Sequence, residues 1–126
     1  MTQQYIVYGA ADTGSVAVEA ALTLAGRPYR VEETPPLADR AASEAFAAIN
    51  PMRQVPALGL PSGEVVTESA AILIWLADTF PAAGLGPGLP DPRRAAFLQW
   101  MSFVSSAIYA LYWIRDDPLR LAADAD

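Results

Sequence analysis

The residues of this chain that could take part in chemistry are hydroxyl, carboxylate and guanidinium side chains, together with backbone amides. The 126 residues include no Cys, no His and no Lys. This composition excludes a cysteine nucleophile, a Schiff-base lysine and a zinc site built from Cys and His ligands. The net charge of -6 argues against a nucleic acid partner, because phosphate neutralisation needs a basic surface. Any thiol chemistry must therefore use a sulfur that a ligand brings.

The first group of candidate residues is Asp12-Thr13-Gly14-Ser15, between a predicted strand and a predicted helix. Parallel α/β units bind ligands at the carboxyl ends of their strands, where helix N-termini present unpaired N–H groups. A hydroxyl there can stabilise a thiolate and lower the thiol pKa from about 8.5. Thr13 and Ser15 are therefore the candidate catalytic residues, although a Ser or Thr at this place is also typical of a helix N-cap.

The second group lies in Asn50–Leu58, where Pro56 opens a predicted strand. An X-Pro bond at a tight turn can be cis, and this would turn the Val55 backbone outward to pair with an extended peptide. The alternative is a rigid loop in which Arg53 is solvated.

The third group is Thr67-Glu68-Ser69, at the start of a predicted helix. Ser69 and the helix N–H groups can hold a carboxylate, whereas Glu68 can take an ammonium group. This pair suits the two charged ends of an amino acid. A capping serine beside an acidic residue is the structural alternative.

Short apolar runs and helical patterns alternate over the first 80 residues and predict the order β-α-β-α-β-β-α. In the first helix, we expect Val16, Ala20 and Leu24, with Ala17 and Ala21, to face the core. The leading β-α-β unit implies a parallel strand pair. This order brings the three candidate groups to one end of the sheet. The predicted strands are 5–8, 29–33, 55–60 and 65–67, and the predicted helices are 15–25, 39–49 and 69–80.

A Gly- and Pro-rich linker follows, and Asp91-Pro92 then predicts a helix start. The helical pattern continues to about Ile114. Residues 95–114 carry no charge and are long enough to span a bilayer, so a membrane-attached domain is one interpretation. Polar residues within this helix favour the other interpretation, a helix packed against further helices.

At this point the sequence resembles a known family. The segments Asn50-Pro51-x-x-Gln54-Val55-Pro56-Ala57-Leu58 and Thr67-Glu68-Ser69-Ala70-Ala71-Ile72-Leu73, in this element order, resemble the thioredoxin-like N-terminal domain of soluble glutathione transferases. From Asp91 onward the chain resembles the start of that family's all-helical second domain. The resemblance implies a thioredoxin-like α/β domain over residues 1–80, a linker over 81–91, and the first long helix of an all-α domain within 92–126.

The resemblance also implies a glutathione site without a metal. Val55 would pair its backbone with the cysteinyl part of glutathione, and Glu68 with Ser69 would hold the γ-glutamyl end. Gln54 and Arg53 would lie near the tripeptide backbone or the glycyl carboxylate. The matching positions are Arg53, Gln54, Val55, Pro56, Glu68 and Ser69.

The thiol-activating position departs from the family pattern. Asp12 stands where the theta- and zeta-like classes carry a catalytic serine, and Gly14 stands where the bacterial beta class carries a cysteine. Because the Asp12 carboxylate would disfavour a neighbouring thiolate, activation falls to Thr13, Ser15 or backbone amides. We expect Ser15 to act, since it also starts the helix. Arg53 replaces a small residue common in the family and would partly offset the charge of Asp12.

The expected function is transfer of glutathione to a small hydrophobic electrophile, in a cytoplasmic, homodimeric detoxification enzyme. The N-terminus shows no signal-peptide pattern. The alternative is a non-catalytic glutathione-binding or interaction protein of the same fold. The expected second domain holds only its first helix, so we expect an apolar face to need cover from a partner, a dimer mate or further helices. This face comprises Trp100, Phe103, Val104 and Ile108.

Overall fold

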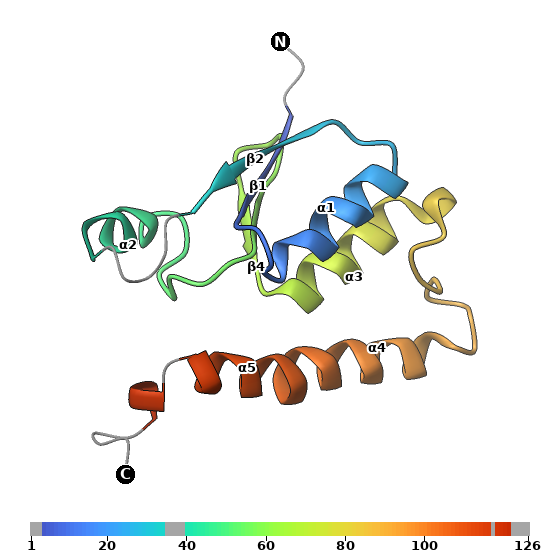
Figure 1. Cartoon of the computed structure of the whole chain (residues 1–126). Helices are drawn as coiled ribbons and strands as arrows, with labels where there is room; N and C mark the ends of the chain where they lie inside the picture. Colours follow the sequence, from blue (N-terminus) through green and yellow to red (C-terminus); the bar gives the residue numbers. More distant parts are fainter. Residues whose placement is uncertain (1–3, 35–39, 117, 122–126) are drawn as a thin grey trace.

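The computed structural model describes residues 4–34, 40–116 and 118–121, and it follows the predicted order of elements (Figure 1). Three short helical segments complete the regular structure: a 3₁₀ turn at Pro81–Ala83, a π-helical segment (η2) at Val104–Ile108 and a 3₁₀ turn at Pro118–Arg120. The strands are β1 (Tyr5–Gly9), β2 (Tyr29–Glu33), β3 (Ala57–Gly59) and β4 (Val65–Thr67). The helices are α1 (Ser15–Leu24), α2 (Arg40–Phe46), α3 (Ser69–Thr79), α4 (Arg94–Phe103) and α5 (Tyr109–Asp116).

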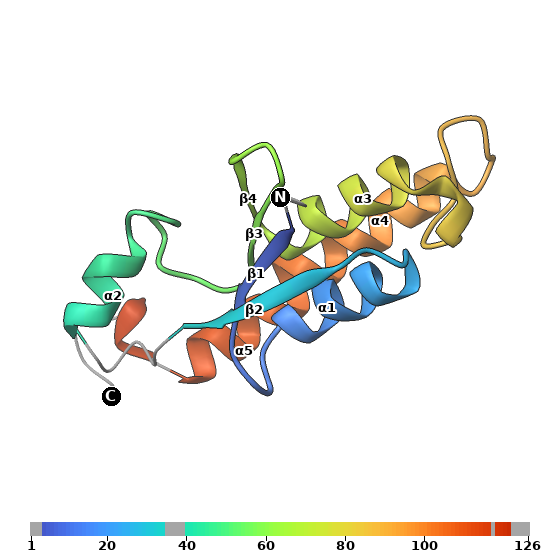
Figure 2. The same cartoon turned by 90° about the horizontal axis from the view of Figure 1, so that it is seen from above.

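The four strands form one sheet in the order β2-β1-β3-β4. β1 and β2 are parallel, whereas β3 is antiparallel to both β1 and β4. Helices α1 and α3 lie side by side on one face of the sheet, and α2 lies on the opposite side (Figures 1 and 2). The predicted thioredoxin-like α/β domain followed by a long helix is thereby confirmed.

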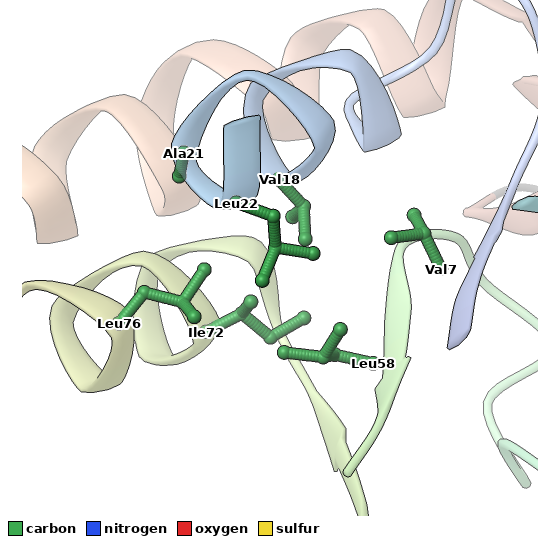
Figure 3. Close-up of a cluster of buried hydrophobic side chains, with 7 residues drawn as sticks. All are labelled: Val7, Val18, Ala21, Leu22, Leu58, Ile72 and Leu76. Carbon is green, nitrogen blue, oxygen red and sulfur yellow. The ribbon is translucent and has the colours of Figure 1, made fainter. Parts of the chain in front are cut away.

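The core lies between the sheet and the pair α1 and α3, as Figure 3 shows. Each fully buried aliphatic side chain contributes about 1.5–3 kcal/mol through removal from water. The fully buried aliphatic residues are Val7, Val18, Leu22, Leu58, Ile72 and Leu76.

The predicted inward face of α1 was wrong except at Ala21, which is buried in the core. Val16 and Leu24 are 54% and 71% exposed, whereas Ser15, Val18 and Leu22 are fully buried. The reason lies at the end of β1, where Gly9 has no side chain and Ser15 packs directly on its backbone. A Cβ on Gly9 would lie 2.2 Å from the Ser15 Cβ. Since Ser15 is fixed there, residues three and seven positions later face the core.

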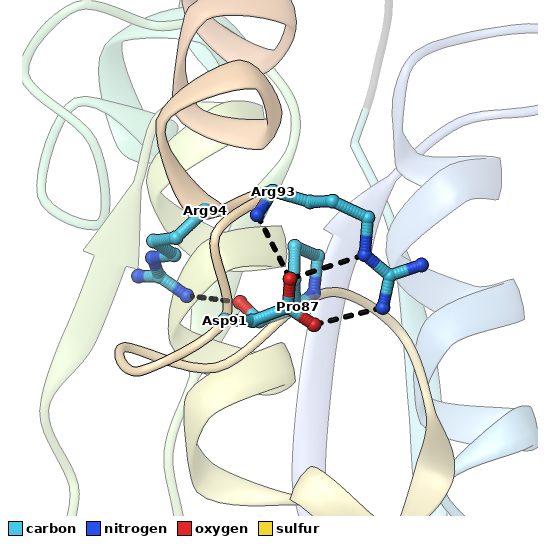
Figure 4. A network of polar contacts seen from close by, with 4 residues as sticks. All are labelled: Pro87, Asp91, Arg93 and Arg94. Carbon is cyan, nitrogen blue, oxygen red and sulfur yellow. Dashed lines mark hydrogen bonds and ion pairs between the residues drawn. The ribbon is translucent and has the colours of Figure 1, made fainter.

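The start of α4 is tied to α3 by ionic hydrogen bonds. Arg94 binds both carboxylate oxygens of Asp78, at 2.7 and 2.9 Å. It also donates to the Pro87 carbonyl at 2.9 Å, as Figure 4 shows. The hydrogen bond from Arg94 lowers the pKa of Asp78. Beside it, hydrogen bonds from Arg93 lower the pKa of Asp91 to about 2. These contacts hold the long helix beneath α3.

The long helix is less regular than its sequence pattern predicts. It passes from α4 through η2 into α5 and ends at Asp116. Within the described residues, Arg94–Asp116 is the one helix long and apolar enough to cross a membrane, with a mean hydropathy of 1.2. Length and composition do not separate a membrane span from a second-domain helix. Trp100 and Phe103 are 59% and 47% exposed on this helix.

Candidate functional site

An open cavity of about 1000 Å³ lies between the sheet end of the first domain and the long helix. Its size is at the upper end of the range found for small-molecule sites. All the predicted site residues except Ser15 line this cavity. The lining residues among them are Thr13, Arg53, Gln54, Val55, Pro56, Glu68 and Ser69. The structure therefore brings the three candidate groups together, as the element order predicts. Their roles in binding and catalysis stay predictions.

Backbone strain gathers at this cavity. Asp12, Arg53 and Glu68 have φ values of 59°, 55° and 69°, and they are the non-glycine residues with positive φ in the described part of the chain. All three line the cavity. Such conformations are unfavourable for L-residues and cluster at ligand sites, where the surrounding structure holds them. The sequence singled out these residues for their charge and carried no signal for their strain.

The hydroxyls of Thr13 and Ser15 are both engaged in a local network. Thr13 Oγ1 donates to the Ala10 carbonyl at 2.7 Å, and the two hydroxyl oxygens lie 3.0 Å apart. Ser15 Oγ lies 3.1 Å from the same carbonyl and 3.4 Å from Glu19 Oε1. Ser15 is fully buried and does not line the cavity, whereas Thr13 does. The expected preference for Ser15 over Thr13 therefore does not match their positions.

The loop before β3 is held by Asn50, which the sequence placed at the start of the second group without indicating a role for its side chain. Asn50 is 3% exposed; its Nδ2 donates to the Gln54 carbonyl at 2.8 Å, and its Oδ1 accepts from the Met52 N–H at 3.0 Å. The Val55-Pro56 peptide is cis. Neither the N–H nor the C=O of Val55 has a hydrogen-bond partner among the described residues. The Val55 backbone is thus available to an extended ligand.

The start of α3 presents two different groups to the cavity, the Glu68 carboxylate and the helix N-terminus at Ser69. Glu68 is exposed and directly precedes the helix, and Ser69 is its first residue. Neither side chain forms a hydrogen bond within the described part of the chain. The first N–H groups of a helix lack intrahelical acceptors and carry partial positive charge. This arrangement can bind a carboxylate at Ser69 and an ammonium group at Glu68.

The opposite wall comes from η2 and α5, and sequence reasoning missed it as part of the site. A Cβ on Gly14 would lie 3.4 Å from Tyr109 Cε1 and 3.5 Å from Pro56 Cδ, so Tyr109 covers the N-terminus of α1. Tyr112 and Trp113 also line the cavity. Tyr112 and Trp113 follow Tyr109 by three and four positions, so the three side chains lie on one face of the helix. This spacing is the sequence pattern that could have indicated the second wall of the cavity. No metal-binding group of three or more His, Cys, Asp or Glu side chains exists among the described residues.

Comparison with known proteins identifies relatives of this chain. Residues 15–79 match the family model for the glutathione S-transferase N-terminal domain. The chain is 34% identical over 120 residues to an uncharacterized GST-like protein, YncG, of Escherichia coli K12, covering 94% of this chain and 58% of that protein. It is 36% identical over 97 residues to maleylacetoacetate isomerase of Rattus norvegicus, covering 75% of this chain and 44% of the isomerase.

A solved structure matches the fold of nearly the whole chain. The crystal structure of a glutathione transferase homologue from Sulfitobacter, with bound glutathione, matches this chain with a TM-score of 0.85 and 31% identity. The match covers 98% of this chain and 59% of that one, so this chain spans less than two thirds of the length of these relatives. The family-model match covers half of the sequence, and the fold agrees with it. The chain belongs to the glutathione S-transferase family.

Proposed function

We propose that this protein binds glutathione in the cavity and transfers it to a small hydrophobic electrophile, with the new bond formed at the glutathione sulfur. The observation that carries the proposal is the convergence of an unpaired Val55 backbone, the Glu68-Ser69 helix start and the N-terminus of α1 on one cavity. The bound glutathione of the Sulfitobacter homologue supports the choice of ligand.

Each part of glutathione has a chemically suited group in this cavity. The Glu68 carboxylate would accept hydrogen bonds from the γ-glutamyl ammonium, while Ser69 and the α3 amides would donate to its carboxylate. The Val55 backbone would pair with the cysteinyl residue. Arg53 and Gln54 would lie near the glycyl carboxylate. The strained φ of Glu68 and Arg53 places both side chains on the cavity wall.

The N-terminus of α1 supplies the electrostatic setting for the sulfur. The partial positive charge at a helix N-terminus stabilises an anion, so it favours the thiolate over the thiol. The thiolate then attacks the electrophilic carbon: a C–S bond forms, the leaving group departs with its bonding electron pair, and the thiol proton passes to solvent. Phe46, Tyr112 and Trp113 offer an aromatic wall for the electrophile. The absence of Cys and His from the sequence is compatible with this chemistry, because glutathione brings the nucleophile.

A second candidate function is glutathione binding without catalysis. The observation that favours it is Asp12, whose carboxylate lines the cavity beside the predicted position of the sulfur. A negative charge there opposes thiolate formation. Cytoplasmic location, homodimer formation and a role in detoxification are parts of the transferase proposal that need their own tests.

Two measurements on the unsubstituted chain separate these functions. Retention on immobilised glutathione, with elution by free glutathione, is expected for both candidates. Turnover of a chlorodinitrobenzene with glutathione, followed by product absorbance, is expected only for the transferase. Retention without a rate above the uncatalysed reaction would favour the binding protein. Failure of both measurements would overturn the glutathione proposal altogether.

A further inference from the structure

The hydrogen bonds near the N-terminus of α1 leave open which group donates to the glutathione sulfur. A hydroxyl has one proton to donate. The proton of Thr13 has an acceptor at 2.7 Å in the Ala10 carbonyl, and that of Ser15 has acceptors in Ala10 and Glu19. For either hydroxyl to donate to a ligand, this buried network must first break.

The Tyr109 side chain also brings a hydroxyl to the N-terminus of α1, and this hydroxyl is not part of that hydrogen-bond network. Its Cε1 lies 3.4 Å from the position of a Cβ on Gly14, and Cε1 is bonded to the ring carbon that carries the hydroxyl. Tyr109 is 46% exposed and lines the cavity. Its hydroxyl has no hydrogen-bond partner among the described residues. This donor is therefore available to a ligand.

We propose that the Tyr109 hydroxyl donates the hydrogen bond that stabilises the thiolate of bound glutathione. The inference rests on the proposed function and adds to it that the activating hydroxyl comes from the long helix rather than from the first domain. The proton stays on the phenol while the thiol proton goes to solvent. This hydrogen bond lowers the thiol pKa and so raises the fraction of bound glutathione present as thiolate at neutral pH. It weakens as the C–S bond forms, because the sulfur loses its negative charge to the leaving group.

The helix geometry around Tyr109 supports this role. The π-helical segment Val104–Ile108 ends immediately before Tyr109. Such segments are rare, replace the usual hydrogen bonds with wider i→i+5 ones, and occur frequently at functional sites. The widened turn changes the rotation of α5 relative to α4. Ser105 and Ile108 of this segment line the cavity together with Tyr109.

The test compares Tyr109→Phe with a matched phenol deletion elsewhere. Tyr109→Phe keeps the ring over Gly14 and removes only the donor. Tyr29→Phe removes a hydroxyl that contacts Thr23 on the surface, 3.2 Å away and outside the cavity. The ionisation of bound glutathione is followed by thiolate absorbance against pH. Affinity for reduced glutathione is measured by calorimetry, and conjugation of a chlorodinitrobenzene gives kcat.

The Tyr109→Phe variant is expected to raise the bound thiol pKa by about one unit, so the thiolate fraction at neutral pH falls by up to about tenfold. We expect kcat to fall with it, while glutathione affinity stays within twofold. Tyr29→Phe is expected to match the unsubstituted chain. The charged residues that line the cavity are present in all variants, so they cancel in the comparison: Asp12, Arg53, Glu68, Arg115 and Asp116.

Two results would overturn the inference, and they differ from failure of the proposed function. A bound thiol pKa unchanged in Tyr109→Phe would overturn the role of Tyr109 alone. A pKa raised instead by Thr13→Val would assign the hydrogen bond to the first domain. Absence of glutathione binding by the unsubstituted chain would overturn the proposed function and this inference together.

Discussion

Replacing Gly9 with alanine perturbs the contact that seats α1 on the sheet. The added Cβ would lie 2.2 Å from the Ser15 Cβ and 2.3 Å from its Oγ, whereas ordinary contacts begin at 3.4 Å. Because one clashing atom is a Cβ, no side-chain rotation relieves the overlap. The first turn of α1 must move by more than an ångström, and Thr13 and Gly14 at the cavity move with it.

The size of the effect follows from this overlap. Overpacking a filled core costs about 1–3 kcal/mol, and we expect Gly9→Ala to cost about 2–3 kcal/mol because both partners are fixed to the backbone. In a Ser15→Gly background, the nearest remaining atom would be the residue 15 Cα at 3.7 Å, which is ordinary contact. Ser15→Gly alone loses a buried hydrogen bond and helix propensity, each worth about 1 kcal/mol.

The assay is a double-mutant cycle. Urea unfolding at pH 7, followed by circular dichroism, gives the free energy of unfolding for the original chain, both single variants and the double variant. We expect Gly9→Ala to be nearly neutral in the Ser15→Gly background, which gives a coupling energy of about 2 kcal/mol. Additive effects, or a Gly9→Ala cost below about 0.5 kcal/mol, would refute the packing of Ser15 on β1.

Three further predictions concern charge. Asp12→Asn keeps a residue that tolerates the φ of 59° and removes a negative charge, so we expect a lower thiol pKa for bound glutathione by thiolate absorbance. Glu68→Gln is expected to weaken glutathione affinity about tenfold in calorimetry, with unfolding unchanged. Since Arg94 lowers the pKa of Asp78, their contribution is full above the unfolded-state value of 3.8 and is lost as pH falls through the folded-state pKa. Urea unfolding should therefore show a smaller loss of stability on acidification in Asp78→Asn than in the original chain.

Each of these predictions has an opposing result. A thiol pKa unchanged by Asp12→Asn would separate that carboxylate from the sulfur. Affinity unchanged by Glu68→Gln would place the γ-glutamyl ammonium elsewhere. Parallel acid profiles for Asp78→Asn and the original chain would show that this ion pair adds nothing to stability.

The sequence was sufficient to predict the fold and the three groups of residues that the first domain contributes to the cavity wall. The alternating patterns and turn residues specify β-α-β-α-β-β-α, because local propensity and tertiary structure agree in these segments. Gln54, Val55 and Ser69 lie at element boundaries, so their meeting at one end of the sheet follows from the element order. These predictions required only local pattern and topology.

The parts that were missed depend on contacts between distant segments. The buried face of α1 is set by the fit of Ser15 against Gly9, and an Ala-rich helix has no strong pattern to reveal its orientation. Tyr109 reaches Gly14 across 95 positions of sequence. Nothing in the local pattern of Val104–Ile108 indicates that this segment is π-helical rather than α-helical.

The most direct test of the glutathione site is a titration of the isotope-labelled chain with reduced glutathione, followed by two-dimensional amide NMR. We predict that the amide signals of Gly14, Val55 and Ser69 shift together along one saturation curve, since these residues come from the three groups that meet at the cavity. The signal of Arg27, beside a smaller pocket on another part of the surface, should stay in place. Unmoved signals at the three cavity residues, or shifts confined to the surroundings of Arg27, would contradict a glutathione site in this cavity.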